Sequence, residues 1–256
     1  MKIITQMTLA ILLTASCGAQ NLLTNGAFSQ GNTGFSSGYS YVASGEAASP
    51  GAYGVRTNSQ SFNGAYNLFY DHTTGQGNML LLDGAPGITT TVWTEMVSVM
   101  TNTQYSYSCW ATASDLFNVP TLRFFINGAQ VGADMTLSTN SGQWQQFVAV
   151  WNSGATNMAT LSVVDENPNG YDYGNDFALD DFSFSFAPLL SIALSDDNNV
   201  VVSWPSPSTG FLLQQNAGFI ATNWTNSSLS VNDNGTTKSV TNSVLAEHLF
   251  FRLMHP

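Results

Sequence analysis

Short β-strand patterns, each closed by turn-forming residues, follow one another along this chain. Residues 105–111 alternate Tyr and Cys with Ser and Trp, the period of two that a half-buried strand requires. Residues 122–126 run directly into Asn127-Gly128, a dipeptide that favours a tight β-hairpin. Between residues 21 and 186, no stretch of a dozen residues repeats apolar side chains at the helical spacing. The sequence therefore predicts an all-β protein built as antiparallel sandwiches.

The dipeptide Ala187-Pro188 divides this pattern into two parts. Before it, residues 20–187 hold the longer strands, with long Gly-rich loops in their first half. After it, residues 188–256 hold six short strand-like segments separated by Asp, Asn, Pro or Gly. The second of these segments carries Trp204, which we expect to anchor the core of a small immunoglobulin-like or fibronectin-III-like sandwich. We therefore predict two β domains.

Residues 1–19 have the layout of a secretory signal peptide: one Lys, an apolar run over residues 7–13, and then small side chains. Cleavage after Ala19 is one interpretation. The other treats residues 13–17 as a lipobox, in which Cys17 becomes the lipid-bearing first residue of an anchored protein. No later apolar run approaches the ~20 residues of a transmembrane helix. We expect a secreted or cell-surface protein with no transmembrane segment.

The chain is poor in charge, and in positive charge above all. It has 256 residues with 5 Lys and Arg against 16 Asp and Glu, for a net charge of -11. Nucleic acids and anionic lipid surfaces are bound by clustered Lys and Arg, so the sparse positive charge excludes nucleic acid and disfavours electrostatic docking on anionic lipid. Amides, hydroxyls and aromatic rings dominate what remains, and they suit an uncharged, hydroxyl-rich partner. The one cysteine beyond the signal segment, Cys109, alternates with aromatic residues and is expected in the core.

Several phrases of the first domain carry a family resemblance. They are NLLTNGAFSQGNTGFSSGYSYV, PGAYGVRTN, DHTTGQGNMLLLDGA, TVWTEMVSV, LRFFINGAQVG, WQQFVAVWNSGATNMATLSVVDEN and GNDFALDDFSF. Together they resemble secreted bacterial galactose-binding-like domains, which include carbohydrate-binding modules of families four, nine and twenty-two. The resemblance implies a jelly-roll fold and suggests glycan binding. The remainder of the chain resembles a small C-terminal β module of Verrucomicrobia-type secreted proteins, and that resemblance assigns it no function.

The resemblance also implies a structural calcium ion between the first and last strands of the jelly roll. Asp180 and Asp181 match the acidic pair of the last strand, and backbone oxygens near Asn25 are candidates for further ligands. The acidic residue usual after the first Phe is missing, because Ser29 and Gln30 stand there. Strand alternation would place Asp180 and Asp181 on opposite faces, so only one of them would reach a given ion. The alternative role for these carboxylates is hydrogen bonding to nearby backbone N–H groups.

Aromatic side chains in the Gly-rich loops are the candidates for binding a ligand. Sugar rings stack on tyrosines while amides and acids bind hydroxyl groups, so a site of this kind needs both. The predicted ligand-binding residues are Tyr39, Tyr41, Tyr53, Arg56, Tyr66, Tyr70, Asp71 and His72. Arg56 has an alternative partner in Glu46, and Asp71-His72 is expected to orient the loop rather than to catalyse. The hypothesis requires the loop tyrosines to share one exposed face.

The sequence thus favours a secreted, non-catalytic protein that recognises a neutral glycan. A structural cell-surface or matrix protein with an adhesive role is the alternative. A secreted glycoside hydrolase is less favoured. It would use the acids that gather over residues 165–181, but sequence proximity in one loop does not place two carboxyl groups across a cleft.

Overall fold

The computed structural model describes residues 21–256, except for 48, 86–88, 116, 167–172, 196, 198, 207, 209–210, 219–222, 244–248 and 255–256. The signal-peptide and lipobox predictions, and with them Cys17, fall outside the described residues. The described chain forms two units, of which the first is Asn21–Ser185 and the second begins at Phe186. Within the described residues, no helix has the length and apolar character needed to cross a bilayer.

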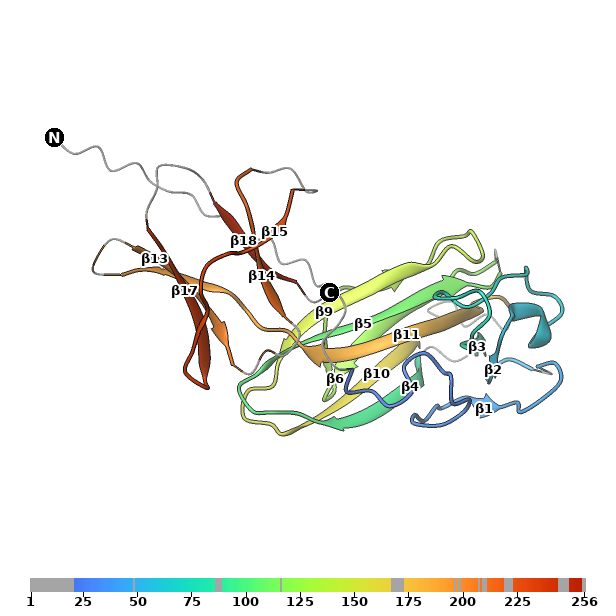
Figure 1. The fold of residues 1–256 in the computed structure, drawn as a ribbon. Helices are drawn as coiled ribbons and strands as arrows, with labels where there is room; N and C mark the ends of the chain where they lie inside the picture. Colours follow the sequence, from blue (N-terminus) through green and yellow to red (C-terminus); the bar gives the residue numbers. More distant parts are fainter. Residues whose placement is uncertain are drawn as a thin grey trace. The chain divides into compact units, whose positions relative to one another are not determined.

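Two stacked sheets form the first unit (Figure 1). Its strands are β1 (Ser40–Tyr41), β2 (Ala52–Arg56), β3 (Met79–Asp83), β4 (Thr89–Ser98), β5 (Gln104–Ala113), β6 (Thr121–Ile126), β7 (Ala129–Gln130), β8 (Met135–Thr136), β9 (Gln145–Asn152), β10 (Met158–Glu166) and β11 (Phe177–Phe186). One sheet has the order β1-β2-β3-β11-β5-β9, and the other has the order β4-β10-β6-β7, with β8 also paired to β6. The long strands pair antiparallel, and only the short β1 runs parallel to β2. The predicted all-β architecture is confirmed.

The main core lies between these two sheets and is rich in aromatic rings. Phe124 of β6 stacks on Phe147 of β9 with ring centroids 3.5 Å apart, and Trp93 of β4 stacks on Phe182 of β11 at 4.1 Å. Both stacks join one sheet to the other, which is how alternating side chains fill a sandwich. Cys109 is fully buried in this core, as expected.

A second, smaller core lies on the outer face of the six-stranded sheet. Residues 57–70, here called the cover segment, include the 3-10 turn η1 (Ser59–Ser61) and fold over β2, β3 and β11. Phe62, Tyr66 and Phe69 of the cover segment pack against residues of β2, β3 and β11. Buried Ser59 fixes the segment, because its hydroxyl donates to the Asn67 carbonyl at 2.6 Å and accepts the Phe69 N–H at 3.0 Å. The Gly-rich loop thus builds core as well as surface.

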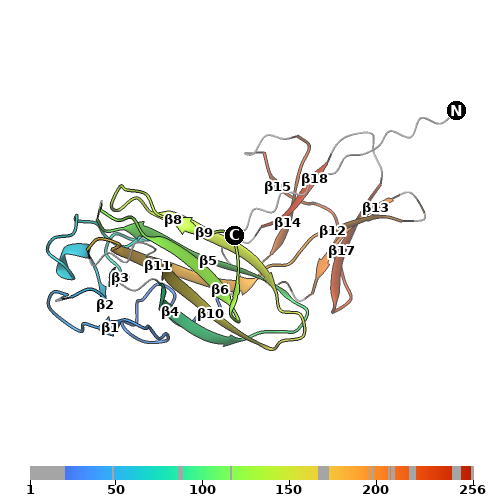
Figure 2. The same cartoon turned by 180° about the vertical axis from the view of Figure 1, so that it is seen from behind.

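The second unit has two small sheets of its own (Figure 2). Its described strands are β12 (Ser191–Leu194), β13 (Asn199–Pro205), β14 (Leu212–Asn216), β15 (Thr225–Asn226), β16 (Asn232–Asp233), β17 (Thr237–Ser243) and β18 (Phe250–Met254). The sheet orders are β12-β13-β17-β16 and β15-β14-β18. Trp204 lies in the core with residues of both sheets, and its indole N–H donates to Ser208 Oγ at 3.1 Å. The prediction of Trp204 as a core anchor is confirmed.

Candidate functional site

The outer face of the β5–β9 strand pair is open and has an unusual composition. Strand register places Ser106 opposite Val150, Ser108 opposite Val148 and Trp110 opposite Gln146. We call these six residues the β5–β9 face. Val148 is 45% exposed and Val150 is 52% exposed, although the inner positions of β9 are filled by core side chains. A row of exposed apolar side chains beside hydroxyls marks a contact surface.

An aromatic group closes one end of this face. The His72 ring stacks on the Trp110 ring, with centroids 3.8 Å apart and an interplanar angle of 17°. Trp144 meets His72 edge-on at 5.8 Å, and its indole N–H donates to the Tyr70 carbonyl at 3.3 Å. Trp110 remains partly exposed, and its indole N–H has no protein partner among the described residues. The face therefore combines flat rings with a free hydrogen-bond donor.

His72 is held in place by the last strand of the unit. Its backbone N–H donates to Asp180 Oδ2 at 3.0 Å, and its Nδ1 lies 2.8 Å from Asp181 Oδ2. Thr73 Oγ1 also hydrogen-bonds to Asp181. Asp71 closes the loop itself, since its carboxylate accepts the N–H groups of Thr74 and Gly77 at 2.8 Å and 2.7 Å. These contacts orient the ring stack rather than offer a reacting group.

The carboxyl groups beside His72 differ in their acidity. Burial raises the pKa of Asp180 to about 7, and the neighbouring charges of Asp181 and Asp71 add to the rise. For Asp71, burial acts to raise the pKa, but the N–H groups of Thr74 and Gly77 outweigh it and hold the pKa below its usual value. Asp180, which lies on β11 beside this loop, is thus a carboxyl group whose charge changes near neutral pH.

The loop tyrosines do not share one exposed face, so that part of the site hypothesis is wrong. Tyr39, Tyr53 and Tyr66 are 6%, 7% and 3% exposed. The Tyr39 hydroxyl donates to Asp165 Oδ2 at 2.7 Å, and the Tyr53 hydroxyl donates to Asn32 Oδ1 at 3.0 Å. Tyr66 belongs to the cover segment, and its ring packs into the outer core beneath that segment. Tyr53 is buried as a residue of strand β2, and Tyr66 is buried because its Gly-rich loop folds back on the sheet, which the sequence did not indicate.

The other predicted ligand residues have mixed positions. Tyr41 and Tyr70 are 42% and 47% exposed, and only Tyr70 is joined to the aromatic group beside the β5–β9 face. Arg56 donates to the carbonyls of Val55 and Val42 at 2.9 Å and 2.8 Å, and no described ion pair joins it to Glu46. Asp71 and His72 are brought to the edge of the face, as given above.

The predicted calcium ligands are arranged differently from the expectation. Asp180 and Asp181 both line one open pocket of about 330 Å³, together with Asp71, because Asp181 has a positive φ of 48° that interrupts strand alternation. Asn25 does not line it: its amide donates to the carbonyls of Gly31 and Thr33 within its own loop.

The pocket lining is rich in oxygen, the donor type that calcium prefers. However, no three Asp, Glu, His or Cys side chains converge on one point anywhere in the described residues. Asp71 and Asp180 already accept backbone N–H groups. Calcium at this pocket stays a prediction from the sequence.

Sequence reasoning missed the central residues of the face. Trp110, Gln146 and Val148 were outside the set of loop aromatics. The signal for Trp110 was present, because it occupies the polar phase of an alternating strand whose other phase is core. An aromatic residue in that phase points outward and is as much a candidate for ligand binding as an aromatic residue in a loop.

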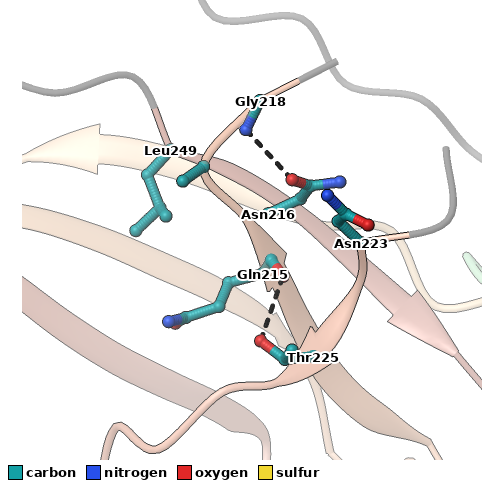
Figure 3. A pocket seen from close by; sticks show the side chains of 7 residues that line it. Gln215, Asn216, Gly218, Asn223, Thr225 and Leu249 are labelled. Carbon is teal, nitrogen blue, oxygen red and sulfur yellow. Dashed lines mark hydrogen bonds between the residues drawn. The ribbon is translucent and has the colours of Figure 1, made fainter. Parts of the chain in front are cut away.

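The second unit contains a pocket of about 300 Å³ (Figure 3). Its lining is uncharged and consists of Gln215, Asn216, Ala217, Gly218, Asn223, Thr225 and Leu249. Asn216 Oδ1 accepts the Gly218 N–H at 3.0 Å, and Thr225 Oγ1 donates to the Gln215 carbonyl at 3.5 Å. Among the described residues, no aromatic or charged side chain lines this pocket, so the β5–β9 face is the stronger candidate site.

Comparison with protein-family models and with curated proteins found no match. Solved structures show likenesses at low identity. The CBM22-1 xylan-binding domain of Xyn10C from Paenibacillus barcinonensis is 16% identical over 67% of this chain and 97% of that chain, with a TM-score of 0.43. TmCBM61, solved in complex with β-1,4-galactotriose, is 14% identical over 66% of this chain and 100% of that chain, with a TM-score of 0.43.

A third likeness is to an enzyme. The arabinose-bound α-L-arabinofuranosidase MgGH51 is 14% identical over 67% of this chain and 27% of that chain, with a TM-score of 0.40. These likenesses concern the fold alone, so the ligand of this chain has to be inferred from its own residues.

Proposed function

We propose that this is a secreted, non-catalytic carbohydrate-binding protein, whose first unit holds a neutral glycan on the β5–β9 face. The observation that carries the proposal is the stacked His72–Trp110 pair at the end of a row of exposed valines and partly exposed serines. Flat rings accept the apolar C–H face of a sugar, while serine hydroxyls, the Gln146 amide and the indole N–H accept and donate to its hydroxyl groups.

The charge of the protein supports a neutral rather than an acidic glycan. Among the described residues, Arg123 pairs with Asp134 and Glu166, and Arg56 donates to backbone carbonyls. No Lys or Arg is among the six residues of the face. A uronic acid would meet the Asp181 carboxylate beside His72 with no Lys or Arg on the face to pair with it, so it would be repelled.

Affinity electrophoresis tests the proposal with soluble xylan, β-1,4-galactan and hydroxyethylcellulose as probes. We expect at least one probe to retard the wild-type protein. Trp110→Ala should reduce that retardation about tenfold or more, as is typical of an aromatic residue at a binding hot spot. Met96→Ala is the matched control, because Met96 is 64% exposed on the other sheet. Retardation by none of these probes, or equal loss in both variants, would contradict the proposal. Reducing-end release from the retarding probe is expected to stay at background.

A structural role through self-association is the alternative function. β9 is the last strand of its sheet order and bears the exposed Val148 and Val150, so a second copy could add a strand along this edge. Sedimentation velocity separates the two proposals. A dimer that Val148→Lys dissociates, without any glycan retardation, would favour assembly over carbohydrate binding.

Secretion is part of the proposal and rests on residues 1–19 alone. Expression with the native N-terminus, followed by N-terminal sequencing, tests it. A chain that starts at Gln20 supports signal cleavage. A blocked, lipid-modified Cys17 supports the anchored alternative, and an intact Met1 contradicts both.

A further inference from the structure

Three polar residues lie in a row across the six-stranded sheet, at the end away from Asp181. The last registered pair between β3 and β11 is Leu82 with Phe177, so Asp83 and Asp176 form the next pair. On the other side of β11, the Ser114 N–H donates to the Asp176 carbonyl at 2.8 Å. The sheet order β3-β11-β5 therefore places Asp83, Asp176 and Ser114 side by side.

The three side chains project from the same face. Leu82 and Phe177 are fully buried in the main core, and alternation turns Asp83 and Asp176 to the opposite, outer face. Ser114 follows Ala113 of β5 in the same way. Above them lies the cover segment, from which Asn63 hydrogen-bonds to Asp83 and Tyr66 hydrogen-bonds to Asp176.

Two like charges directly opposite each other destabilise a strand pair, and burial increases the repulsion between them. Asp176 is 7% exposed. The described ion pairs involve Arg123 and His72 and leave this row without a cation. The Gly84 N–H donates to Asp176 Oδ1 at 2.8 Å, but no described Lys or Arg side chain pairs with either carboxylate.

Ser114 supplies a second and independent observation. It is fully buried, and its Oγ has no hydrogen-bond partner. A buried hydroxyl without a partner costs about 1–3 kcal/mol, so such groups are rare unless something else contacts them. Its cross-strand position beside Asp176 points this oxygen into the space between the carboxylates and the cover segment.

We propose that Asp83, Asp176 and Ser114 form a calcium site beneath the cover segment. Carboxylate and hydroxyl oxygens are hard donors, and no imidazole or thiolate lies in the row, which favours calcium over zinc. Two carboxylates balance the charge of one divalent ion. The Tyr66 hydroxyl and water would supply the remaining oxygens of the six to eight that calcium takes, while the Asn63 amide oxygen accepts the Ala65 N–H at 3.0 Å and is not a ligand. Calcium would then tie the cover segment to β3, β11 and β5.

Differential scanning calorimetry of the full chain, stripped of metal and then given about 10 mM Ca²⁺, tests this site. That concentration is roughly ten times the weakest Kd typical of extracellular calcium modules. We expect the unfolding midpoint of the wild-type first unit to rise by about 3–6 °C. Asp83→Asn and Ser114→Ala should abolish the rise. In metal-free buffer Asp83→Asn should melt above wild type, because it removes the repulsion.

Asp181→Asn is the control, since Asp181 lines the separate pocket beside His72. It should keep the calcium response. No response in wild type, a response that survives Asp83→Asn and Ser114→Ala, or a response that only Asp181→Asn removes would each overturn the proposal. Glycan retardation by xylan, galactan or hydroxyethylcellulose is scored separately, so the calcium site and the β5–β9 face fail or hold independently.

Discussion

The substitution Asp180→Asn measures how the buried carboxyl group that positions His72 contributes to stability as the pH changes. Asp180 is 1% exposed and accepts the N–H groups of His72 and Asp181 at 3.0 Å and 2.8 Å. Burial raises its pKa from 3.8 to about 7. The folded protein therefore holds this proton more tightly than the unfolded chain does. Its contribution to stability is fully present below pH 3.8 and is lost as the pH rises through about 7.

The size of the effect follows from the shift. One pKa unit corresponds to about 1.4 kcal/mol, so the free energy of unfolding should fall on the order of 4 kcal/mol between the two pKa values. Asparagine does not titrate in this range. The stability of wild type minus that of Asp180→Asn should therefore decrease by this amount across the window, measured as urea unfolding by tryptophan fluorescence from about pH 4 to pH 8.5.

Asp134→Asn provides the matched control. The Asp134 side chain is 40% exposed and is paired with Arg123 at 2.8 Å, and hydrogen bonding to Arg123 lowers its pKa. Its contribution is present above the unfolded pKa and is lost only at lower pH, so the difference from wild type should be flat from about pH 5 upward. The reasoning about Asp180 is refuted if its difference curve is equally flat, or if it rises with pH.

Three further results are expected. Phe124→Ala should cost about 3–5 kcal/mol in urea unfolding, because it removes a ring stacked between the sheets; a cost below about 1 kcal/mol would contradict that packing. Cys109 should resist thiol reagents until the protein unfolds, since burial raises the pKa of its thiol; labelling of the native protein in the absence of denaturant would refute this. Gly128→Ala should cost about 1–2 kcal/mol because Gly128 has a φ of 77°, whereas Ala129→Gly, its neighbour in the exposed β7, should cost less.

Local patterns were enough to predict much of the fold. The Asn127-Gly128 hairpin is present, with Ile126 paired to Ala129 and positive φ at both turn residues. Phe124, Phe147, Phe177 and Phe182 were expected in the core, and all are at most 6% exposed. These positions follow from turn chemistry and alternation, which act over a few residues and leave a direct trace in the sequence.

The site was harder to predict because it depends on contacts between distant segments. In the sequence, Tyr66 and Tyr39 cannot be told from exposed loop tyrosines. Tyr66 is buried by the fold of its own loop, and the Tyr39 hydroxyl is held by Asp165, 126 positions away. The His72–Trp110 stack joins a loop to a strand 38 positions later. Such pairs are set by strand order in the sheet, which a single sequence does not state.

The positive φ of Asp181 has a consequence for the whole of β11. Before it, the odd-numbered Phe177 and Leu179 face the main core, and after it the even-numbered Phe182 and Phe184 do. The inward-facing positions of β11 thus shift by one residue at Asp181, so the outer face of the first half and that of the second half are formed by different positions. The first half can carry an outer core under the cover segment while the second half leaves its outer side open. The positive φ of Asp181 therefore marks the boundary on the outer face of this sheet between the part under the cover segment and the part that is open to solvent.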